Sequence, residues 1–214
     1  MASEAALRRD VTNVCRRLWE RGLIAGQDGN VSVRLGRGRV LVTPAGISKV
    51  DVRAADLVVV NLDGSRTRSG GTASSEVALH LRAYARRPDV AAVVHAHPPT
   101  ATAFALAGES LPTHALTEIE ALLGRVPLVP YATPGTEELA DRFDPFWAEH
   151  DVFLMANHGA LTLGSTLRLA HQRMETLEHA AQVVSAARAL GGIRHLSAGQ
   201  AAALSRHKSE SGLS

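Results

Sequence analysis

The chain of 214 residues has one cysteine, two lysines, eight aromatic residues and no long hydrophobic run. The lone cysteine, Cys15, excludes an intrachain disulfide and favours a reducing compartment. The first ten residues lack the apolar centre of a signal peptide, and no apolar run reaches the roughly 18 residues that a membrane helix needs. We therefore expect a cytoplasmic protein that has no membrane partner.

Excess charge of one sign is also missing. The 23 basic residues nearly balance 21 acidic ones, which leaves a net charge of +2. With so few aromatic side chains to stack on bases, we expect no nucleic-acid partner. The length suits one domain, and the hydrophobic fraction of 45% is that of a globular protein. Since no repeat or linker divides the chain, we expect a single domain over residues 1–214, with a flexible C-terminal tail from about residue 207.

Hydrophobic periodicity divides the chain into helices and strands. Helical spacing predicts helices at about residues 4–21, 76–87, 100–106, 137–149, 166–190 and 197–206. Short apolar or β-branched runs predict strands at about residues 31–35, 39–43, 57–62, 90–97, 126–131 and 152–156. Because the first strands read as a hairpin and helices are interleaved later, we expect an α/β domain. Its central sheet is mostly antiparallel, with helices on both faces.

Three of the ten histidines occur at the ends of apolar strands. His95 and His97 are two residues apart, so on a strand their side chains share one face. His158 ends another apolar strand, and Gly159 permits a sharp exit that would leave the His158 ring at a sheet edge. Three imidazoles with one open coordination position are typical of a catalytic zinc site. The spacing does not exclude cobalt, nickel or manganese, and packed, hydrogen-bonded imidazoles are the alternative.

The other seven histidines fall on predicted helices or loops, where solvated or capping roles are the expectation. Lys49 is interpreted first as a solvated surface charge, with assistance to phosphate binding or pairing at an interface as the alternative.

Three short loops could bind an anion through backbone N–H groups or hydroxyls. They contain Gly29 and Asn30, then Ala45 and Gly46, then Ser74 and Ser75 before a predicted helix. Ordinary turns and helix N-capping explain the same residues equally well. Glu76 follows the serine pair, and beside a metal and an apolar wall its pKa could rise toward that of a working base.

Five motifs occur in a fixed order along the chain: Gly29-Asn30-Val31-Ser32, Thr43-Pro44-Ala45-Gly46, Ser74-Ser75-Glu76, His95-Ala96-His97 and Asn157-His158-Gly159. Together they resemble the class II aldolase/adducin family, over about residues 5–195, with the L-fuculose-1-phosphate aldolase branch the nearest. The resemblance implies a three-layer α/β/α zinc enzyme that forms a homotetramer, with one Zn²⁺ per subunit and active sites at subunit interfaces.

The resemblance also implies residue roles. His95, His97 and His158 match the zinc ligands, and Glu76 matches an acid/base residue that can also approach the metal. The residues that match positions holding the substrate phosphate are Gly29, Asn30, Ala45, Gly46, Ser74 and Ser75. The sequence departs from the fuculose-phosphate branch of the family at positions that concern the substrate. That branch has a tyrosine near the position of Ala115 or Leu116 and another in the C-terminal tail, and both are missing here. Ala45 occupies a position where threonine is usual.

The implied activity is that of an aldehyde-lyase acting on a small phosphorylated sugar. A ketose 1-phosphate such as L-fuculose 1-phosphate would give dihydroxyacetone phosphate and an aldehyde such as L-lactaldehyde. Glutamate at position 76 favours a lyase, because the epimerase branch carries a shorter carboxylate there. A methylthioribulose-1-phosphate dehydratase or a sugar-acid phosphate decarboxylase is the alternative, and we expect release of dihydroxyacetone phosphate to distinguish aldol cleavage from both. A non-catalytic, adducin-like oligomeric module is the alternative from outside the enzymes.

Overall fold

A computed structural model describes residues 3–65 and 71–211, without the side chains of α6 beyond residue 204. Seven strands form one sheet in the order β3-β2-β1-β4-β7-β6-β5. Every neighbouring pair is antiparallel except β5 with β6. The strands are β1 (Asn30–Gly36), β2 (Arg39–Val42), β3 (Val58–Asn61), β4 (Ala92–Ala96), β5 (Leu128–Val129), β6 (Val152–Met155) and β7 (Gly159–Gly164). The expected mostly antiparallel sheet is confirmed.

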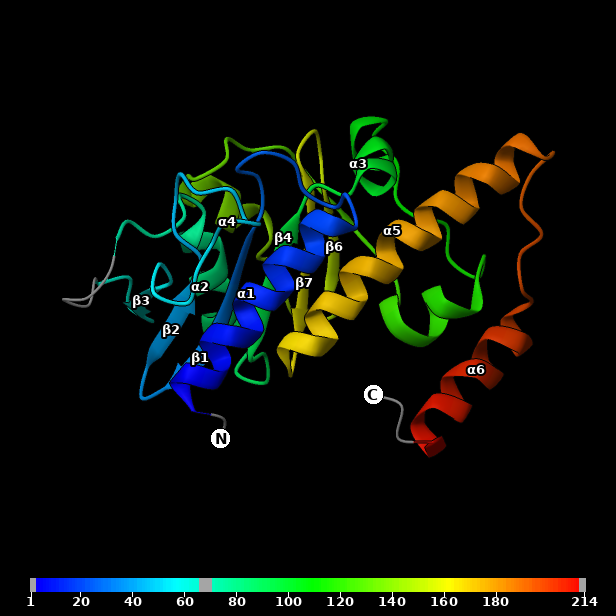
Figure 1. Cartoon of the computed structure of the whole chain (residues 1–214). Coiled ribbons are helices and arrows are strands. Elements are labelled where there is room, and N and C mark those ends of the chain that lie inside the picture. The colour runs from blue at the N-terminus through cyan, green and yellow to red at the C-terminus, as the bar shows by residue number, and fades with distance from the viewer. Residues whose placement is uncertain (1–2, 66–70, 212–214) are drawn as a thin grey trace.

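Helices cover both faces of this sheet, as Figure 1 shows. The helical elements are α1 (Glu4–Glu20), α2 (Val77–Arg86), α3 (Pro99–Leu106), η1 (Ile119–Leu123), α4 (Glu137–Arg142), α5 (Leu167–Ala189) and α6 (Ala198–Ser211). One hydrophobic core lies between the sheet and α1, α3, η1 and α5, and a second lies between the sheet and α2 and α4. The domain therefore has three layers, α/β/α. Within the described residues, no helix combines the length and the hydropathy needed to cross a membrane.

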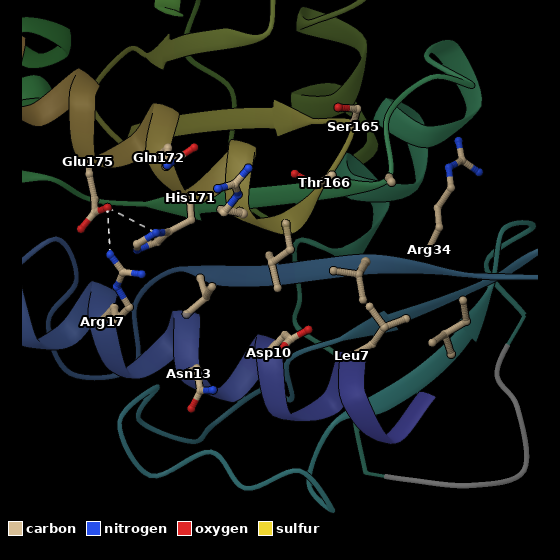
Figure 2. A pocket seen from close by; sticks show the side chains of 16 residues that line it. Leu7, Asp10, Asn13, Arg17, Arg34, Ser165, Thr166, His171, Gln172 and Glu175 are labelled. Atoms are coloured by element: carbon tan, nitrogen blue, oxygen red, sulfur yellow. Dashed lines mark hydrogen bonds and ion pairs between the residues drawn. The ribbon is translucent and has the colours of Figure 1, made fainter. Parts of the chain in front are cut away.

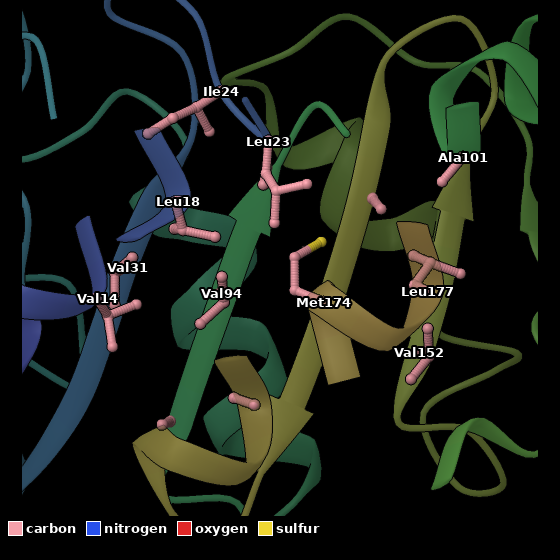
Figure 3. Close-up of a cluster of buried hydrophobic side chains, with 14 of the residues drawn as sticks. Val14, Leu18, Leu23, Ile24, Val31, Val94, Ala101, Val152, Met174 and Leu177 are labelled. Carbon is pink, nitrogen blue, oxygen red and sulfur yellow. The ribbon is translucent and has the colours of Figure 1, made fainter. Parts of the chain in front are cut away.

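Local sequence explains the first helix and its packing. The Ser3 side chain accepts a hydrogen bond from the backbone N–H of Ala6, which caps α1. Val11, Val14, Cys15 and Leu18 recur at helical spacing and are buried against the sheet. Figure 3 shows Val14 and Leu18 meeting Val31 of β1 and Val94 of β4, with Met174 and Leu177 of α5 closing the same core.

The alternation of side chains along β1 and β4 determines which residues face α2. Val31 and Val94 belong to the core under α1 and α5, while Val93 belongs to the core under α2. Because neighbours in a strand point to opposite faces, Asn30, Ser32 and His95 point toward α2. Asn30 of β1 is paired with His95 of β4 in the sheet register. Polar residues of two central strands thus meet on the α2 face, close to one end of the sheet.

The elements depart from the sequence prediction in several places. No helical element was predicted where η1 (Ile119–Leu123) lies, and β5 has two residues where a strand over 126–131 was predicted. The predicted helix over 137–149 is shorter, since α4 ends at Arg142, and the last helix runs past Arg206 to Ser211. The sequence does not predict strand β7, yet this strand lies in the interior of the sheet between β4 and β6. Its sequence, Gly-Ala-Leu-Thr-Leu-Gly, has glycine at both ends and one β-branched residue, which weakens the strand signal. Residues 207–211 of the predicted tail thus belong to α6, and residues 212–214 lie outside the described residues.

Candidate active site

Three histidine side chains converge where β4 and β6 end and β7 begins. His95 lies near the end of β4, His97 follows it, and His158 lies in the turn that joins β6 to β7. The ligand atoms of these three residues all lie within 4.8 Å of one another. His158 is therefore not at a sheet edge, as the sequence predicted, but between two interior strands. The reason is β7, which pairs with both β4 and β6.

In two of the imidazoles, the Nδ1 atom, which points away from the cluster, contacts another protein group. His95 Nδ1 donates to the carbonyl oxygen of Ala160 at 2.9 Å, and His97 Nδ1 lies 3.4 Å from Asp28 Oδ2. A proton on Nδ1 leaves Nε2 as the free ligand atom, which is the usual arrangement of a metal-binding histidine and its outer partner. The two Nε2 atoms face each other at 3.1 Å. Two nitrogens that each bind a tetrahedral zinc at 2.0–2.1 Å are about 3.3 Å apart, so this spacing fits a shared cation.

Gly159 makes the close approach of these strands sterically allowed. A Cβ at this position would lie 2.6 Å from the Ala96 carbonyl oxygen and 2.6 Å from Cδ2 of His97. Any larger residue would therefore displace the His97 ring or the end of β4. Gly29 is packed just as tightly against β4, because a Cβ at Gly29 would lie 2.8 Å from the His95 carbonyl oxygen.

Glu76 faces the histidine cluster from the start of α2. Its Oε2 lies 3.1 Å from His95 Nε2 and accepts a hydrogen bond of 2.9 Å from Asn30 Nδ2, and its Oε1 lies 3.4 Å from His158 Nε2. Glu76 is only 8% exposed. Three imidazoles and one buried carboxylate are a donor set suited to a divalent transition metal such as zinc.

The buried carboxylate and the imidazoles shift one another's pKa. Burial raises the pKa of Glu76, but the charge and hydrogen bond of His95, the charge of His158 and the Asn30 amide lower it more, to well below its ordinary range. Burial alone lowers the pKa of His95, and Glu76 reverses this and raises it. Burial, followed by repulsion from His95, lowers the pKa of His97 and of His158 to about 4. The sequence predicted a raised pKa for Glu76, and the facing imidazoles are the reason that the shift is in the opposite direction.

Backbone contacts join the predicted anion-binding loops beside Glu76. The Ala45 N–H donates to the Thr72 carbonyl oxygen and the Ser74 N–H donates to that of Thr43, so two of the loops form a short bridge. Ser74 is buried and its hydroxyl accepts a 3.4 Å hydrogen bond from the Glu76 N–H, while Ser75 is exposed. This bond closes a local turn before α2, whose N-cap is Glu76 and which has no side-chain cap, so the N-capping by Ser74 or Ser75 that the sequence offered as one alternative is not formed.

Lys49 lies buried beside the site, whereas the sequence favoured a solvated surface charge over a role in phosphate binding or interface pairing. It is 3% exposed, not a solvated surface charge, and its Nζ donates to the carbonyl oxygens of Gln27 and Ile47 at 2.7 and 3.1 Å. Lys49 thus connects the loop that contains Gly29 to the loop that contains Gly46. Burial lowers its pKa, and the charges of Cys15, Asp28 and Glu76 oppose that shift. A lysine in a polar turn carries no sequence signal of burial, which explains the miss.

A large groove lies elsewhere, between α1 and the first half of α5 (Figure 2). It has a volume of about 820 Å³ and is lined by Asp10, Arg17, Arg34, His171 and Glu175 among others. None of the three clustered histidines lines it, nor does Glu76. Arg34 stands four residues after Asn30 on β1, so the groove opens near the opposite end of that strand. We therefore place the candidate site at the histidine cluster.

Comparisons with known proteins are consistent with this geometry. The profile described as Class II Aldolase and Adducin N-terminal domain matches residues 9–185. A 3-oxo-tetronate 4-phosphate decarboxylase from Escherichia coli O6:H1 (strain CFT073) is 35% identical over 208 residues, which cover 94% of this chain and 96% of the relative.

Two solved structures have a similar fold over nearly the whole chain. YgbL from Escherichia coli is 34% identical with a TM-score of 0.87, and the match covers 94% of this chain and 99% of YgbL. A structure described as L-fuculose 1-phosphate aldolase is 30% identical with a TM-score of 0.88, and the match covers 97% of each chain.

Proposed function

Because the chain belongs to the class II aldolase and adducin family, we propose that it is a metal-dependent lyase for a small phosphorylated sugar or sugar acid. The bond it cleaves joins the hydroxyl-bearing carbon beside a ketone to the next carbon. The observation that carries this proposal is the convergence of His95, His97 and His158 with the buried carboxylate of Glu76.

Each part of the site has a chemical task in this proposal. His95, His97 and His158 would hold one divalent cation, with zinc the best fit to a nitrogen-rich donor set. When bound, the cation would supply Lewis acidity toward the ketone and hydroxyl oxygens of the substrate. Glu76 would carry the proton to and from the reacting carbon. Asn30 holds the Glu76 carboxylate in place through its 2.9 Å hydrogen bond.

The loops beside Glu76 would bind the substrate phosphate. Gly29, Gly46 and Ser75 present backbone groups or a hydroxyl there, and the buried cation of Lys49 adds positive potential between two of the loops. Ala45 contributes only backbone, and its N–H already donates to Thr72. Fixing the phosphate keeps the reacting carbon aligned with Glu76.

Within this reaction class we propose a sugar-acid phosphate decarboxylase, with 3-oxo-tetronate 4-phosphate as the type of substrate. The relative of that name is similar over 94% of this chain. The residues present also fit a decarboxylase. Aldol cleavage needs a group that exchanges a proton with the departing aldehyde, whereas carbon dioxide leaves without one. The tyrosines expected for that task are absent: Ala115 and Leu116 are aliphatic, and the Tyr84 hydroxyl is buried against Ser32.

Aldol cleavage of a ketose 1-phosphate is the second candidate, supported by the similarity to L-fuculose 1-phosphate aldolase. Dihydroxyacetone phosphate does not distinguish the two reactions, contrary to the expectation from the sequence. Loss of carbon dioxide from 3-oxo-tetronate 4-phosphate and protonation of the remaining enediolate also give dihydroxyacetone phosphate. The second product, carbon dioxide or an aldehyde, is what separates them.

The test measures bound metal and both products on the purified protein. We expect one divalent metal per chain and stoichiometric carbon dioxide and dihydroxyacetone phosphate from 3-oxo-tetronate 4-phosphate. Aldehyde release from a panel of ketose 1-phosphates, without decarboxylation, would favour the second candidate. In His95→Ala we expect metal and activity to be lost together, while circular dichroism keeps the signature of the folded domain. A protein that binds no metal would exclude both candidates.

A further inference from the structure

His97 lies outside the sheet and depends on a neighbouring loop for its orientation. The ladder between β4 and β7 ends at Ala96, one residue before His97. The segment over residues 23–29 takes the place of the sheet there. The His97 N–H donates to the Leu23 carbonyl oxygen at 3.0 Å, and Asp28 Oδ2 lies 3.4 Å from His97 Nδ1. The backbone and the ring of this histidine therefore both contact one loop.

The contact between Asp28 and His97 is too exposed to hold the carboxylate in place by itself. The Asp28 side chain is 49% exposed, and an ion pair that water reaches this freely contributes little stability. A carboxylate orients a metal-binding imidazole well only when the carboxylate itself is held. The groups that fix the Asp28 backbone therefore decide whether this contact persists.

The peptide unit between Gln27 and Asp28 is held at both of its polar groups. Its carbonyl oxygen accepts a hydrogen bond of 2.7 Å from Lys49 Nζ, and its N–H donates to the Ala25 carbonyl oxygen at 2.9 Å. Lys49 Nζ also donates to the Ile47 carbonyl oxygen at 3.1 Å. The ammonium group thus attaches the peptide that precedes the carboxylate to a second loop, which a hydrogen bond within residues 25–28 does not do.

Lys49 is a buried cation without an ion pair. It is 3% exposed, and among the residues that the structure describes no carboxylate forms an ion pair with its Nζ, whose acceptors are the two carbonyl oxygens. Burial of an unpaired charge costs free energy, and an apolar side chain of the same length would fill this space without that cost. What an apolar side chain would not supply is the hydrogen bond to the Gln27 carbonyl oxygen.

We propose that Lys49 is a positioning residue of the metal centre, which fixes the Gln27–Asp28 peptide so that the Asp28 carboxylate orients the His97 ring toward the other two histidines. Lys49 acts through Asp28 and contacts no metal ligand directly. This task is separate from the positive potential that Lys49 gives to the loops proposed for the substrate phosphate. The inference rests on the metal-binding part of the proposed function and is independent of which bond the enzyme cleaves.

Zinc affinity tests the proposal, because electrostatics alone predicts the opposite sign. Lys49→Met keeps an unbranched side chain and removes the charge and the donors, and loss of a positive charge near a cation site by itself strengthens cation binding. We expect Lys49→Met instead to weaken zinc binding by about tenfold, and Asp28→Asn by about 10- to 100-fold, the usual effect of an outer partner of a metal ligand. Competition with a chromophoric chelator measures the affinity. Arg9→Met, at an exposed arginine of α1, is the control and should leave it unchanged.

The double substitution shows whether the two residues act along one path. If Lys49 acts through Asp28, then Asp28→Asn has little further effect in the Lys49→Met background, and the two fold-changes do not multiply. Multiplied effects would overturn the proposal, and so would a Lys49→Met protein that binds zinc as tightly as the wild type or more tightly. A wild-type protein that binds no metal would contradict the proposed function as well, which separates the two failures.

Hydrogen exchange of the metal-free protein measures how firmly the loop is held when no ligand is present. In Lys49→Met we expect the Asp28 amide to exchange at least about tenfold faster, because its peptide loses the hydrogen bond to the second loop, while the Val33 amide inside β1 is unchanged. Equal exchange of the Asp28 amide in both proteins would overturn the proposal. If Lys49→Met does not fold, Asp28→Asn decides, since it alters a half-exposed side chain. Wild-type zinc affinity in Asp28→Asn would overturn the proposal by itself.

Discussion

At the scale of single residues, Glu76 is the side chain on which the proposed chemistry depends most. It is nearly buried, and its two oxygens face Asn30 and two imidazoles. These partners favour the ionised carboxylate, so in the cleavage direction Glu76 would first take up a proton from water and then pass it to the enediolate carbon. Glutamine has almost the same shape but carries no ionisable proton, which makes it the informative replacement.

We expect Glu76→Gln to lower kcat by about 10²- to 10⁴-fold, the usual contribution of a general acid or base. Metal content should stay near that of the wild type, because three histidines remain. Kinetics and metal analysis on the same preparation provide the measurement. Glu175→Gln is the matched control, since Glu175 is a partly buried carboxylate that contacts His171 in the distant groove. Full activity in Glu76→Gln would exclude this residue as the acid/base group.

At the scale of elements, the tight β6–β7 turn brings His158 to the other two histidines. The register pairs Met155 with Gly159, so the turn consists of three residues, and Asn157 has a left-handed φ of 56°. Asparagine tolerates this conformation better than most residues. Gly159 then passes against Ala96 and His97 with no room for a side chain.

Gly159→Ala should weaken metal binding by at least about tenfold, because the added methyl group displaces the His97 ring from the shared position. Competition titration with a chromophoric chelator measures that affinity. Gly71→Ala is the control, since a Cβ at Gly71 meets no atom within 4 Å. Unchanged affinity in Gly159→Ala would show that the hairpin end adjusts without moving the ligand.

A second contact between elements fixes the segment that follows His97. Glu178 of α5 is 4% exposed and accepts hydrogen bonds from the backbone N–H groups of Thr100 and Ala101 in the first turn of α3. A carboxylate at a helix N-terminus satisfies N–H groups that have no partner within the helix. The capping residue thus comes from another helix, far away in the sequence.

Glu178→Ala should lower the free energy of unfolding by about 2–4 kcal/mol, through lost charge-assisted hydrogen bonds and a small cavity. Urea unfolding followed by circular dichroism measures the difference. Glu149→Ala, at an exposed glutamate, should change the free energy by less than about 0.5 kcal/mol. Equal effects of the two substitutions would contradict the proposed cap.

At the scale of the whole molecule, several buried histidines make the stability of the metal-free protein depend on pH. The pKa of His97 and of His158 is lowered to about 4 and that of His80 to about 3, from an ordinary value of 6.5. The unfolded chain therefore binds more protons than the folded one between these values. His95 opposes this effect, because its pKa is raised. Three lowered groups outweigh the one that is raised.

We expect the metal-free protein to lose stability as the pH falls from about 6.5 to 4, since the unfolded state is then favoured by proton uptake. Chemical unfolding at pH 7, 6 and 5 after removal of metal by a chelator measures the trend. Added zinc should raise the unfolding midpoint at pH 7 and have less effect at pH 5, where protons compete for the imidazoles. Constant or rising stability toward pH 5 would contradict the assignment of these histidines as buried and neutral.

The predicted homotetramer belongs to the same scale. Tyr131 is 54% exposed and Leu106 is 66% exposed, and the family resemblance places active sites at subunit interfaces. Light scattering coupled to size-exclusion chromatography tests this prediction directly.

The sequence by itself determined the layers of the domain and identified the three histidines that the structure brings together. Hydrophobic periodicity is strong in α1 and α2, and the His-x-His spacing alone is enough to place two imidazoles on one face of a strand. These signals are local, because a side chain's face follows from the period of its own element. The motifs placed L-fuculose-1-phosphate aldolase first and a sugar-acid phosphate decarboxylase second, and the similarity to 3-oxo-tetronate 4-phosphate decarboxylase supports the second.

Only the tertiary structure decided which groups meet and how they titrate. The sequence of β7 predicts a strand only weakly. The strand forms because it pairs through backbone hydrogen bonds with β4 on one side and with β6 on the other. The burial of Lys49 and His80, the Glu178 cap and the lowered pKa of Glu76 all depend on residues distant in the sequence. Burial and charge pairing are properties of a packed arrangement, so no local pattern of residues encodes them.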